Sequence, residues 1–393
     1  MRITKVAVAA ALALASAAAF AQTIKIGFIT SYSGLNGNLG PYMERAVRLY
    51  LKQHEKELGG VKVELITRDD TGPNPDKARQ LAQELVVRDK VNLLAGVIFT
   101  PNAMAMAPIV TEAKVPFVIM NAGTAVITTR SPYMVRTSFT LWQSSYPLGQ
   151  WASKKYKTAY SLVSDFGPGH DSEEGFSKGF EEGGGKMLGK VRVPLQNPDW
   201  AAYMQRVKDA KPDVLQVFIP AGKTATAVMK NFSDLGLDKA GIKLIGPGDI
   251  TTDEELPNMG DVALGVLTVH HYSAAADRPA NKAFVEAWKK EYGAQETPNF
   301  VAVGAYDGAA LIVEAIKQQR GKLDPDKTME IFKHYKNPNS PRGPISIDPE
   351  TRDIVQNEYL REVRKVGGQL ANVEIETVAT ALKDPWKEMQ KKK

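Results

Sequence analysis

The sequence contains no cysteine among its 393 residues. The fold therefore cannot depend on disulfide bonds and must be stabilised by its core. Because no cysteine follows the apolar N-terminal run, a lipoprotein anchor is excluded. No later segment of the sequence approaches the length needed to cross a membrane. Lysine and arginine form no patch with interleaved aromatic residues, so the sequence gives no reason to expect nucleic-acid binding.

The first 21 residues have the pattern of a bacterial secretory signal peptide. Arg2 and Lys5 precede the apolar run VAVAAALALASAAAF, and residues 19–21 form a small-x-small cleavage site. The run is short for a permanent membrane anchor, which is the alternative. We expect export to the periplasm, a mature chain that starts near Gln22 and a soluble product. Without Arg2 and Lys5 the net charge falls from +6 to +4, since 48 basic residues then face 44 acidic ones.

Short apolar strands alternate with amphipathic helices along most of the chain. TIKIGFIT is typical of a buried strand, and the helix predicted after it places Met43, Val47 and Tyr50 on one face. Further strands are predicted at VKVELITRDD, VNLLAGV, VPFVIMN, TAYSLVSD, KMLGKVRVPL, DVLQVFIP and IKLIGPG, each followed by a helix or a loop. This alternation predicts an α/β fold with parallel sheets that carry helices on both faces.

The mature chain, roughly 370 residues long, favours two domains over one very wide sheet. Both halves show the same rhythm of strands and helices, and the division falls within residues 134–156. No Ser/Gly-rich linker separates the halves. We therefore expect two doubly wound lobes that move about a hinge rather than independently.

In open α/β sheets, ligands bind beyond the carboxyl ends of the strands. Thr100 follows one predicted strand, and the loop Ala122, Gly123 and Thr124 follows the next. Hydroxyl groups and free backbone N–H groups at helix starts suit a carboxylate or another small anion. Each feature alone would be an ordinary cap or turn. Together, at the ends of adjacent strands, they favour an anion site.

The second half places other residues at equivalent strand ends. Phe166, Pro220 and Asp249 each follow a predicted strand, and they would face the hydroxyl loops of the first lobe. A cleft between two lobes, lined by such loops, is the natural position for a ligand.

Several patterns suggest catalysis but lack the context that catalysis needs. GFSKG matches the hydrolase Gly-x-Ser-x-Gly motif, yet Ser177 lies inside a predicted helix rather than at a strand–helix elbow. DFGPGH lacks the third glycine of a dinucleotide-binding loop, and EEGGGKM lacks the spacing of a phosphate loop. His270 and His271 lack the spacing of a zinc pair on a helix. We expect no catalysis, no cofactor and no metal, with a secreted serine hydrolase as a distant alternative.

Four runs of sequence, in their order, carry a resemblance to a known family. They are IKIGFITSYSGLNGNLGPYMERAVRLYL, VELITRDDTGPNPDKARQLAQELVVRDKVNLLAGVIFTPNAMAMAPIVTEAKVPFVIMNAGT, SDFGPGHDSEEGF and SPRGPISIDPETRDIVQNEYLREV. The chain resembles the periplasmic Leu/Ile/Val-binding proteins, the solute receptors of ABC importers. The resemblance implies capture of a small ligand by hinge closure, without chemistry, by a monomer that docks on a permease in the inner membrane. A ligand sensor for a membrane receptor would have the same lobes and is an alternative.

The resemblance also implies a chain path with three crossings between the lobes, near residues 139–142, 271–273 and 338–343. The expected division is a signal peptide at 1–21, an N-terminal lobe at 22–140 and 273–340, a C-terminal lobe at 141–272 and 341–385, and a solvated basic tail at 386–393.

The resemblance places the ligand carboxylate at Thr100 and at the loop from Ala122 to Thr124. Amino-acid-binding members hold the ligand ammonium with an acid near GPGD, where Asp249 is adjacent and Gly248 is the alternative match. We expect a branched-chain or other hydrophobic amino acid if Asp249 reaches the ligand, and an aromatic carboxylic acid if it does not. The full set of predicted site residues is Leu39, Phe99, Thr100, Ala122, Gly123, Thr124, Trp142, Phe166, Pro220, Asp249, Tyr272 and Tyr306.

Overall fold

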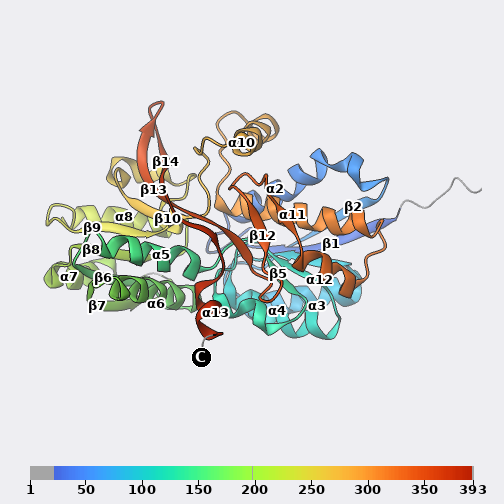
Figure 1. Cartoon of the computed structure of the whole chain (residues 1–393), viewed down its shortest axis with the longest axis horizontal. Helices are drawn as coiled ribbons and strands as arrows, with labels where there is room; N and C mark the ends of the chain where they lie inside the picture. Colours follow the sequence, from blue (N-terminus) through green and yellow to red (C-terminus); the bar gives the residue numbers. More distant parts are fainter. Residues whose placement is uncertain (1–21, 197, 392–393) are drawn as a thin grey trace, which may run out of the picture.

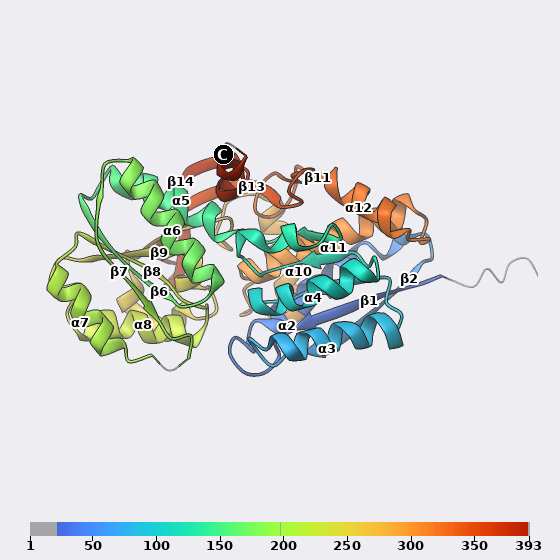
Figure 2. The ribbon, with the colours of Figure 1, turned by 90° about the horizontal axis from the view of Figure 1, so that it is seen from below.

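The computed structural model describes residues 22–196 and 198–391, which form two α/β lobes around two separate sheets (Figure 1). Seen at right angles to that view, the lobes lie side by side along the longest axis (Figure 2). The predicted signal peptide, residues 1–21, lies outside the described residues. Within the described part of the chain, no helix is long and apolar enough to span a membrane.

The first lobe is built on a parallel sheet of five strands in the order β2-β1-β3-β4-β5. The strands are β1 (Thr23–Thr30), β2 (Lys62–Asp69), β3 (Leu93–Gly96), β4 (Phe117–Ile119) and β5 (Met134–Arg136). Alternate side chains of β1 enter different cores, because successive residues of a strand point to opposite faces. Phe28 packs into one core and Ile29 into the other.

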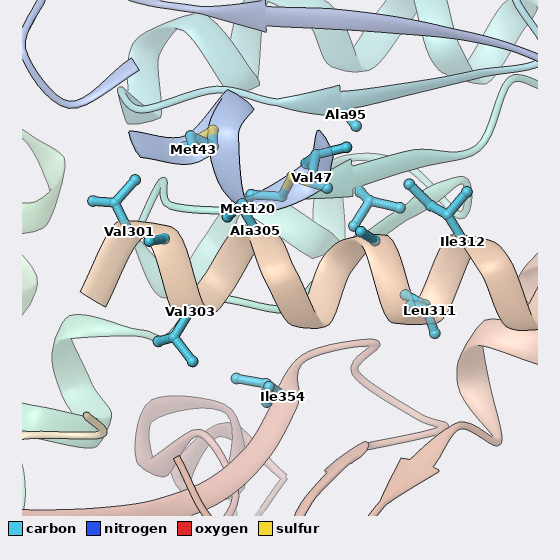
Figure 3. Packing of buried hydrophobic residues seen from close by; sticks show 14 of the residues in the cluster. Met43, Val47, Ala95, Met120, Val301, Val303, Ala305, Leu311, Ile312 and Ile354 are labelled. Atoms are coloured by element: carbon cyan, nitrogen blue, oxygen red, sulfur yellow. The ribbon is translucent and has the colours of Figure 1, made fainter. Parts of the chain in front are cut away.

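Helices cover both faces of this first sheet. They are α2 (Gly40–Gln53), α10 (Pro279–Tyr292), α11 (Phe300–Gln318) and α12 (Pro325–Lys333) on one face, with α3 (Pro75–Gln83) and α4 (Thr100–Glu112) on the other. Figure 3 shows α11 with Val301 and Ala305 facing Met43 of α2 and Met120, the residue just after β4. The helices that follow the second lobe in the sequence thus return to complete the first.

The second lobe contains a wider sheet that is only partly parallel. Its strands β6 (Thr158–Ser164), β7 (Lys186–Val193), β8 (Val214–Phe218), β9 (Lys243–Pro247) and β10 (Leu267–His270) run parallel to one another. The next strand, β13 (Ile354–Val366), is antiparallel to β10 and pairs with β14 (Gln369–Leu382). The helices α5 (Leu141–Ser153) and α6 (Gly167–Glu182) cover one face, and α7 (Trp200–Ala210) and α8 (Lys223–Asp234) the other. The predicted fold class is confirmed, with antiparallel strands added at one edge.

The third passage between the lobes lies within β13, later in the chain than the predicted 338–343. Strand β12 (Ile345–Ile347) pairs with β11 (Lys336–Asn337) and with the start of β13, and this pairing keeps Ile354 in the core of the first lobe. Leu360, further along β13, packs in the core of the second lobe. The strand itself therefore carries the chain across.

The prediction that the basic C-terminal residues form a solvated tail is wrong for Lys387. Asp384 caps the N-terminus of helix α13 (Pro385–Gln390). Its side chain accepts a hydrogen bond from the backbone N–H of Lys387 at 2.7 Å. The Lys387 ammonium is buried and contacts both the carboxylate of Asp353 and the hydroxyl of Thr128. A run of lysines suggests solvent exposure, but here an internal carboxylate compensates the buried charge.

Arg342 joins the hinge segments to the first lobe through a buried guanidinium group. Its Nε donates to Asp307 Oδ2 of α11 at 2.7 Å, and its Nη1 donates to the carbonyl oxygen of Ser138 and to Gln356 Oε1, each at 2.8 Å. Both charged side chains are at most 1% exposed. The ion pair thus connects α11, the segment after β5 and strand β13.

We expect Asp307→Ala to lower the free energy of unfolding by about 3–5 kcal/mol, because it leaves the Arg342 charge buried without its partner. Urea unfolding followed by circular dichroism measures this change. Lys282→Ala is the control, since Lys282 pairs with Asp277 in an exposed ion pair and its loss should change nothing measurable. Equal effects of the two substitutions would contradict the role of the buried pair.

Candidate ligand-binding site

A cavity lies between the two lobes at the carboxyl ends of their parallel strands. Its empty volume is about 390 Å³, which includes the solvent space at its open mouth. The residues that line it come from strand ends, loops and helix starts of both lobes: Asn36, Leu39, Ile98, Phe99, Thr100, Asn121, Gly123, Phe139, Leu141, Phe166, Pro168, Phe218, Pro220, Ala221, Asp249 and Phe300.

Two threonine hydroxyl groups meet on the first-lobe side of the cavity. Thr100 is the first residue of α4, just beyond β3, and Thr124 precedes the 3₁₀ helix Ala125–Arg130, just beyond β4. Because β3 and β4 are adjacent and parallel, their ends bring the two Oγ1 atoms to 2.9 Å from each other. This pair stands at the starts of two helices, where an anion is favoured electrostatically.

Arg136 holds the loop that carries Thr124. Its Nη1 donates to the carbonyl oxygens of Ala122 and Thr124, at 2.9 and 2.8 Å, and its Nη2 to that of Ala125, at 3.3 Å. Its Nη2 also lies 2.8 Å from Oδ1 of Asp353, and both side chains are at most 1% exposed. Sequence reasoning missed this residue, because an arginine at the end of a strand has no pattern that predicts an internal role.

Phenylalanine rings from both lobes form much of the cavity wall. Phe166 and Phe218 belong to the second lobe, and their ring centroids are 6.1 Å apart with nearly parallel planes. Phe139 and Phe300 lie on the other side, with centroids 5.8 Å apart and planes nearly perpendicular. Such a wall suits a flat apolar group, since ring faces and ring edges attract one another in these arrangements.

Asp249 brings a carboxyl group to the cavity from the end of β9. Burial raises its pKa to about 7, although the nearby positive charge of Arg361 opposes the shift. Its Oδ2 has no hydrogen-bond partner among the described residues, and it lies 3.9 Å from Nε2 of His270. Burial moves the pKa of His270 well below its usual value, so the imidazole is neutral at pH 7. Oδ2 of Asp249 could therefore accept a hydrogen bond from a ligand.

A second acceptor lies on the first-lobe side. Asn121 lines the cavity, and its Nδ2 donates to the carbonyl oxygen of Ile98 at 3.0 Å, which assigns its amide orientation. Its Oδ1 has no partner among the described residues. A buried acceptor without a donor is costly, so a ligand that supplies donors would be favoured.

The N-terminus of α6 approaches the threonine pair from the opposite lobe. A Cβ atom added at Gly167 would lie 2.9 Å from Oγ1 of Thr124 and 3.5 Å from Cγ2 of Thr100. The stretch DFGPGH thus closes over the hydroxyl groups at a distance that only glycine permits.

Seven of the predicted site residues line the cavity: Leu39, Phe99, Thr100, Gly123, Phe166, Pro220 and Asp249. Thr124 is hydrogen-bonded to Thr100, which lines the cavity. The carbonyl oxygen of Ala122 accepts a hydrogen bond from Arg136. Their role in ligand binding stays a prediction.

The other three predicted residues lie elsewhere. Trp142 packs within the second lobe against Gly175 of α6. Tyr272 is fully buried against Phe284, and Tyr306 donates to Gln53 Oε1 at 2.6 Å on the outer side of α2. These three side chains are not among the residues that line the cavity, and the sequence could not show this because a lone aromatic residue near a hinge does not indicate where its ring points.

The catalytic patterns in the sequence are not assembled into a site. Ser177 lies in the middle of α6, is buried, and its hydroxyl has no partner among the described residues. His170 instead pairs with Asp165 at 2.7 Å on the rim. Across residues 22–196 and 198–391, no group of three His, Asp or Glu side chains is placed to hold a metal ion.

A profile of the periplasmic binding protein family matches residues 23–369. This chain belongs to that family. The resemblance to the Leu/Ile/Val-binding proteins is confirmed, and the protein is a periplasmic solute-binding protein of an ABC transporter. The family is made of receptors, which are not enzymes.

Relatives of this binding protein match it over almost its whole length. Leu/Ile/Val-binding protein homolog 6 of Brucella melitensis is 44% identical over 370 residues, which cover 94% of this chain and 95% of the relative. A solute-binding protein from Rhodopseudomonas palustris BisB5, solved with 3,4-dihydroxybenzoic acid, is 51% identical, with a TM-score of 0.89 over 93% of this chain and 99% of that one. Another from R. palustris HaA2, solved with p-hydroxybenzoic acid, is 44% identical, with a TM-score of 0.90 and the same coverage.

We expect Gly167→Ala to weaken ligand binding without lowering the stability of the ligand-free binding protein. The new methyl group would force Thr124 to turn away from Thr100, at a cost of about 1–3 kcal/mol in the closed state. A thermal-shift panel of amino acids and small aromatic acids measures this as a smaller ligand-induced rise in Tm. A ligand-induced rise equal to that of the wild type would contradict the close approach.

Proposed function

We propose that this protein captures a hydroxylated aromatic carboxylate and delivers it to an ABC permease in the inner membrane. The observation that carries the proposal is the cavity itself, with phenylalanine rings from both lobes, a hydroxyl pair on one side and a buried carboxyl group on the other. The mature protein would act as a monomer in the periplasm after removal of the signal peptide.

Each part of such a ligand has a counterpart in the cavity. The carboxylate would accept hydrogen bonds from the hydroxyl groups of Thr100 and Thr124, near the positive ends of two helices. The ring would pack among Phe139, Phe166 and Phe218. A phenolic hydroxyl group would donate to the free oxygen of Asp249, which otherwise has no partner among the described residues. Binding of hydroxybenzoic acids by relatives that are 44% and 51% identical supports the same ligand class.

A branched-chain or other hydrophobic amino acid is the second candidate. The free oxygen of Asp249 would serve an α-ammonium group equally well, because a buried cation needs an acceptor or a counter-ion. The Brucella relatives are named Leu/Ile/Val-binding protein homologs, which supports the amino-acid candidate. The aromatic wall favours the ring, because five phenylalanines line the cavity and an aliphatic side chain does not need them.

We expect 4-hydroxybenzoate to raise the Tm of the mature protein in a thermal-shift panel that also contains leucine, isoleucine, valine and benzoate. Stabilisation of about 2.7 kcal/mol follows when the ligand is at about 100 times its Kd. Joint replacement of Thr100→Ala and Thr124→Ala should remove the response to every carboxylate. Replacement of Ser177→Ala is the control and should leave it unchanged. A response to leucine alone would instead establish the amino-acid receptor.

We expect Asp249→Ala to weaken binding of 4-hydroxybenzoate by about tenfold or more, as the loss of a hydrogen bond to a charged group costs about 1.5–3 kcal/mol. Benzoate lacks the hydroxyl group, so its Kd should barely change. Isothermal titration of both ligands against both proteins measures the difference. An equal loss for benzoate would show that Asp249 supports the cavity rather than the ligand hydroxyl.

A further inference from the structure

Two carboxyl groups of the second lobe reach across to helix starts of the first lobe. Oδ2 of Asp171, on α6, accepts a hydrogen bond from the backbone N–H of Ala125 at 2.7 Å. Oε2 of Glu254, in the segment after β9, accepts one from Nδ2 of Asn299 at 3.0 Å. Both contacts lie at the start of a first-lobe helix.

The two contacts flank the cavity from opposite sides. Ala125 follows Thr124 directly, and Asn299 caps α11 by accepting from the backbone N–H of Ala302 just before Phe300, which lines the cavity. Neither acid itself lines the cavity. Both contacts therefore depend on the lobes being closed, although neither involves the ligand.

We propose that Asp171 and Glu254 are positioning residues that hold the lobes closed and so set how long the ligand stays bound. The inference rests on the proposed function only in the choice of ligand. When the lobes separate, both interlobe hydrogen bonds break and both carboxyl groups return to water. The two bonds stabilise the closed state alone, and a contact of that kind shifts the open–closed equilibrium toward closure.

The charged groups around Asp171 and its burial make the open–closed equilibrium depend on pH. The charged groups that face it are Arg136 of β5, Asp384 before α13 and Glu174 of α6 itself, and burial raises the pKa of Asp171 to about 7. In the open state, contact with water would return this pKa to about 4. A pKa that is higher in the closed state means that closure is favoured at low pH and that this advantage is lost as pH rises through about 7.

Between pH 8 and pH 6 the affinity for a carboxylate ligand should therefore increase, by up to about tenfold from Asp171 alone. Asp249, whose pKa burial also raises to about 7, contributes in the same direction. Asp171→Asn keeps an acceptor oxygen but cannot titrate. Because it carries no charge that closure must neutralise, its affinity should exceed the wild-type value at pH 8 and should change less between pH 8 and pH 6 than that of the wild type.

The test is stopped-flow dissociation of 4-hydroxybenzoate from the mature protein at pH 6, where the closed-state carboxyl group of Asp171 is mostly protonated. We expect Asp171→Ala and Glu254→Ala each to raise the dissociation rate about two- to tenfold, with association little changed, because a hydrogen bond contributes modestly in net terms. Asp171→Asn and Glu254→Gln should restore slow dissociation. Glu181→Ala, which removes an exposed acid near the far end of the same helix, is the matched control and should dissociate at the wild-type rate.

Wild-type dissociation rates in both alanine variants would overturn the inference. So would a parallel loss of stability in the ligand-free proteins, measured by urea unfolding, since that would make the two acids ordinary structural residues. If the wild type binds leucine and not 4-hydroxybenzoate, the proposed ligand class is wrong. The same dissociation experiment with leucine then tests the two acids independently.

Discussion

The buried ion pair between Arg136 and Asp353 is the interaction on which the ligand site depends. Asp353 neutralises a guanidinium group that would otherwise be buried without compensation, and this leaves the other N–H groups of Arg136 to bind three carbonyl oxygens of one loop. That loop presents Thr124 to Thr100 on one side and the N–H of Ala125 to the second lobe on the other. A single buried charge thus orders both the anion site and one of the contacts that close it.

The proposed ligand capture draws on two kinds of contact. Under the proposed function, direct contacts would come from hydroxyl groups, phenyl rings and Asp249, and they would determine which molecule fits. Contacts between the lobes, at Asp171 and Glu254, are independent of the ligand's identity and favour closure in general. Because the closed state needs both, specificity and residence time can change separately in related proteins that share the fold.

Much of the site was predictable because parallel strands end at the same edge of a sheet. That rule located Thr100, Phe166 and Asp249 from short stretches of sequence. It could not locate Phe300, which returns from the far end of the chain as the start of α11, nor the cross-lobe partner of Asp171. Pairings of that kind depend on how the two lobes pack against each other, and local sequence patterns do not predict this packing. The burial of Lys387 was missed for the same reason, because its partner belongs to another element.

The contact between Lys387 and Asp353 also gives the order of synthesis a physical meaning. The Asp353 carboxylate forms ion pairs with both Arg136, which holds the loop, and Lys387 of α13. While the chain emerges, the carboxylate can pair with Arg136 but still lacks its second cation. A chain that ends before Lys387 would therefore leave the Asp353 carboxylate with one of its two cations.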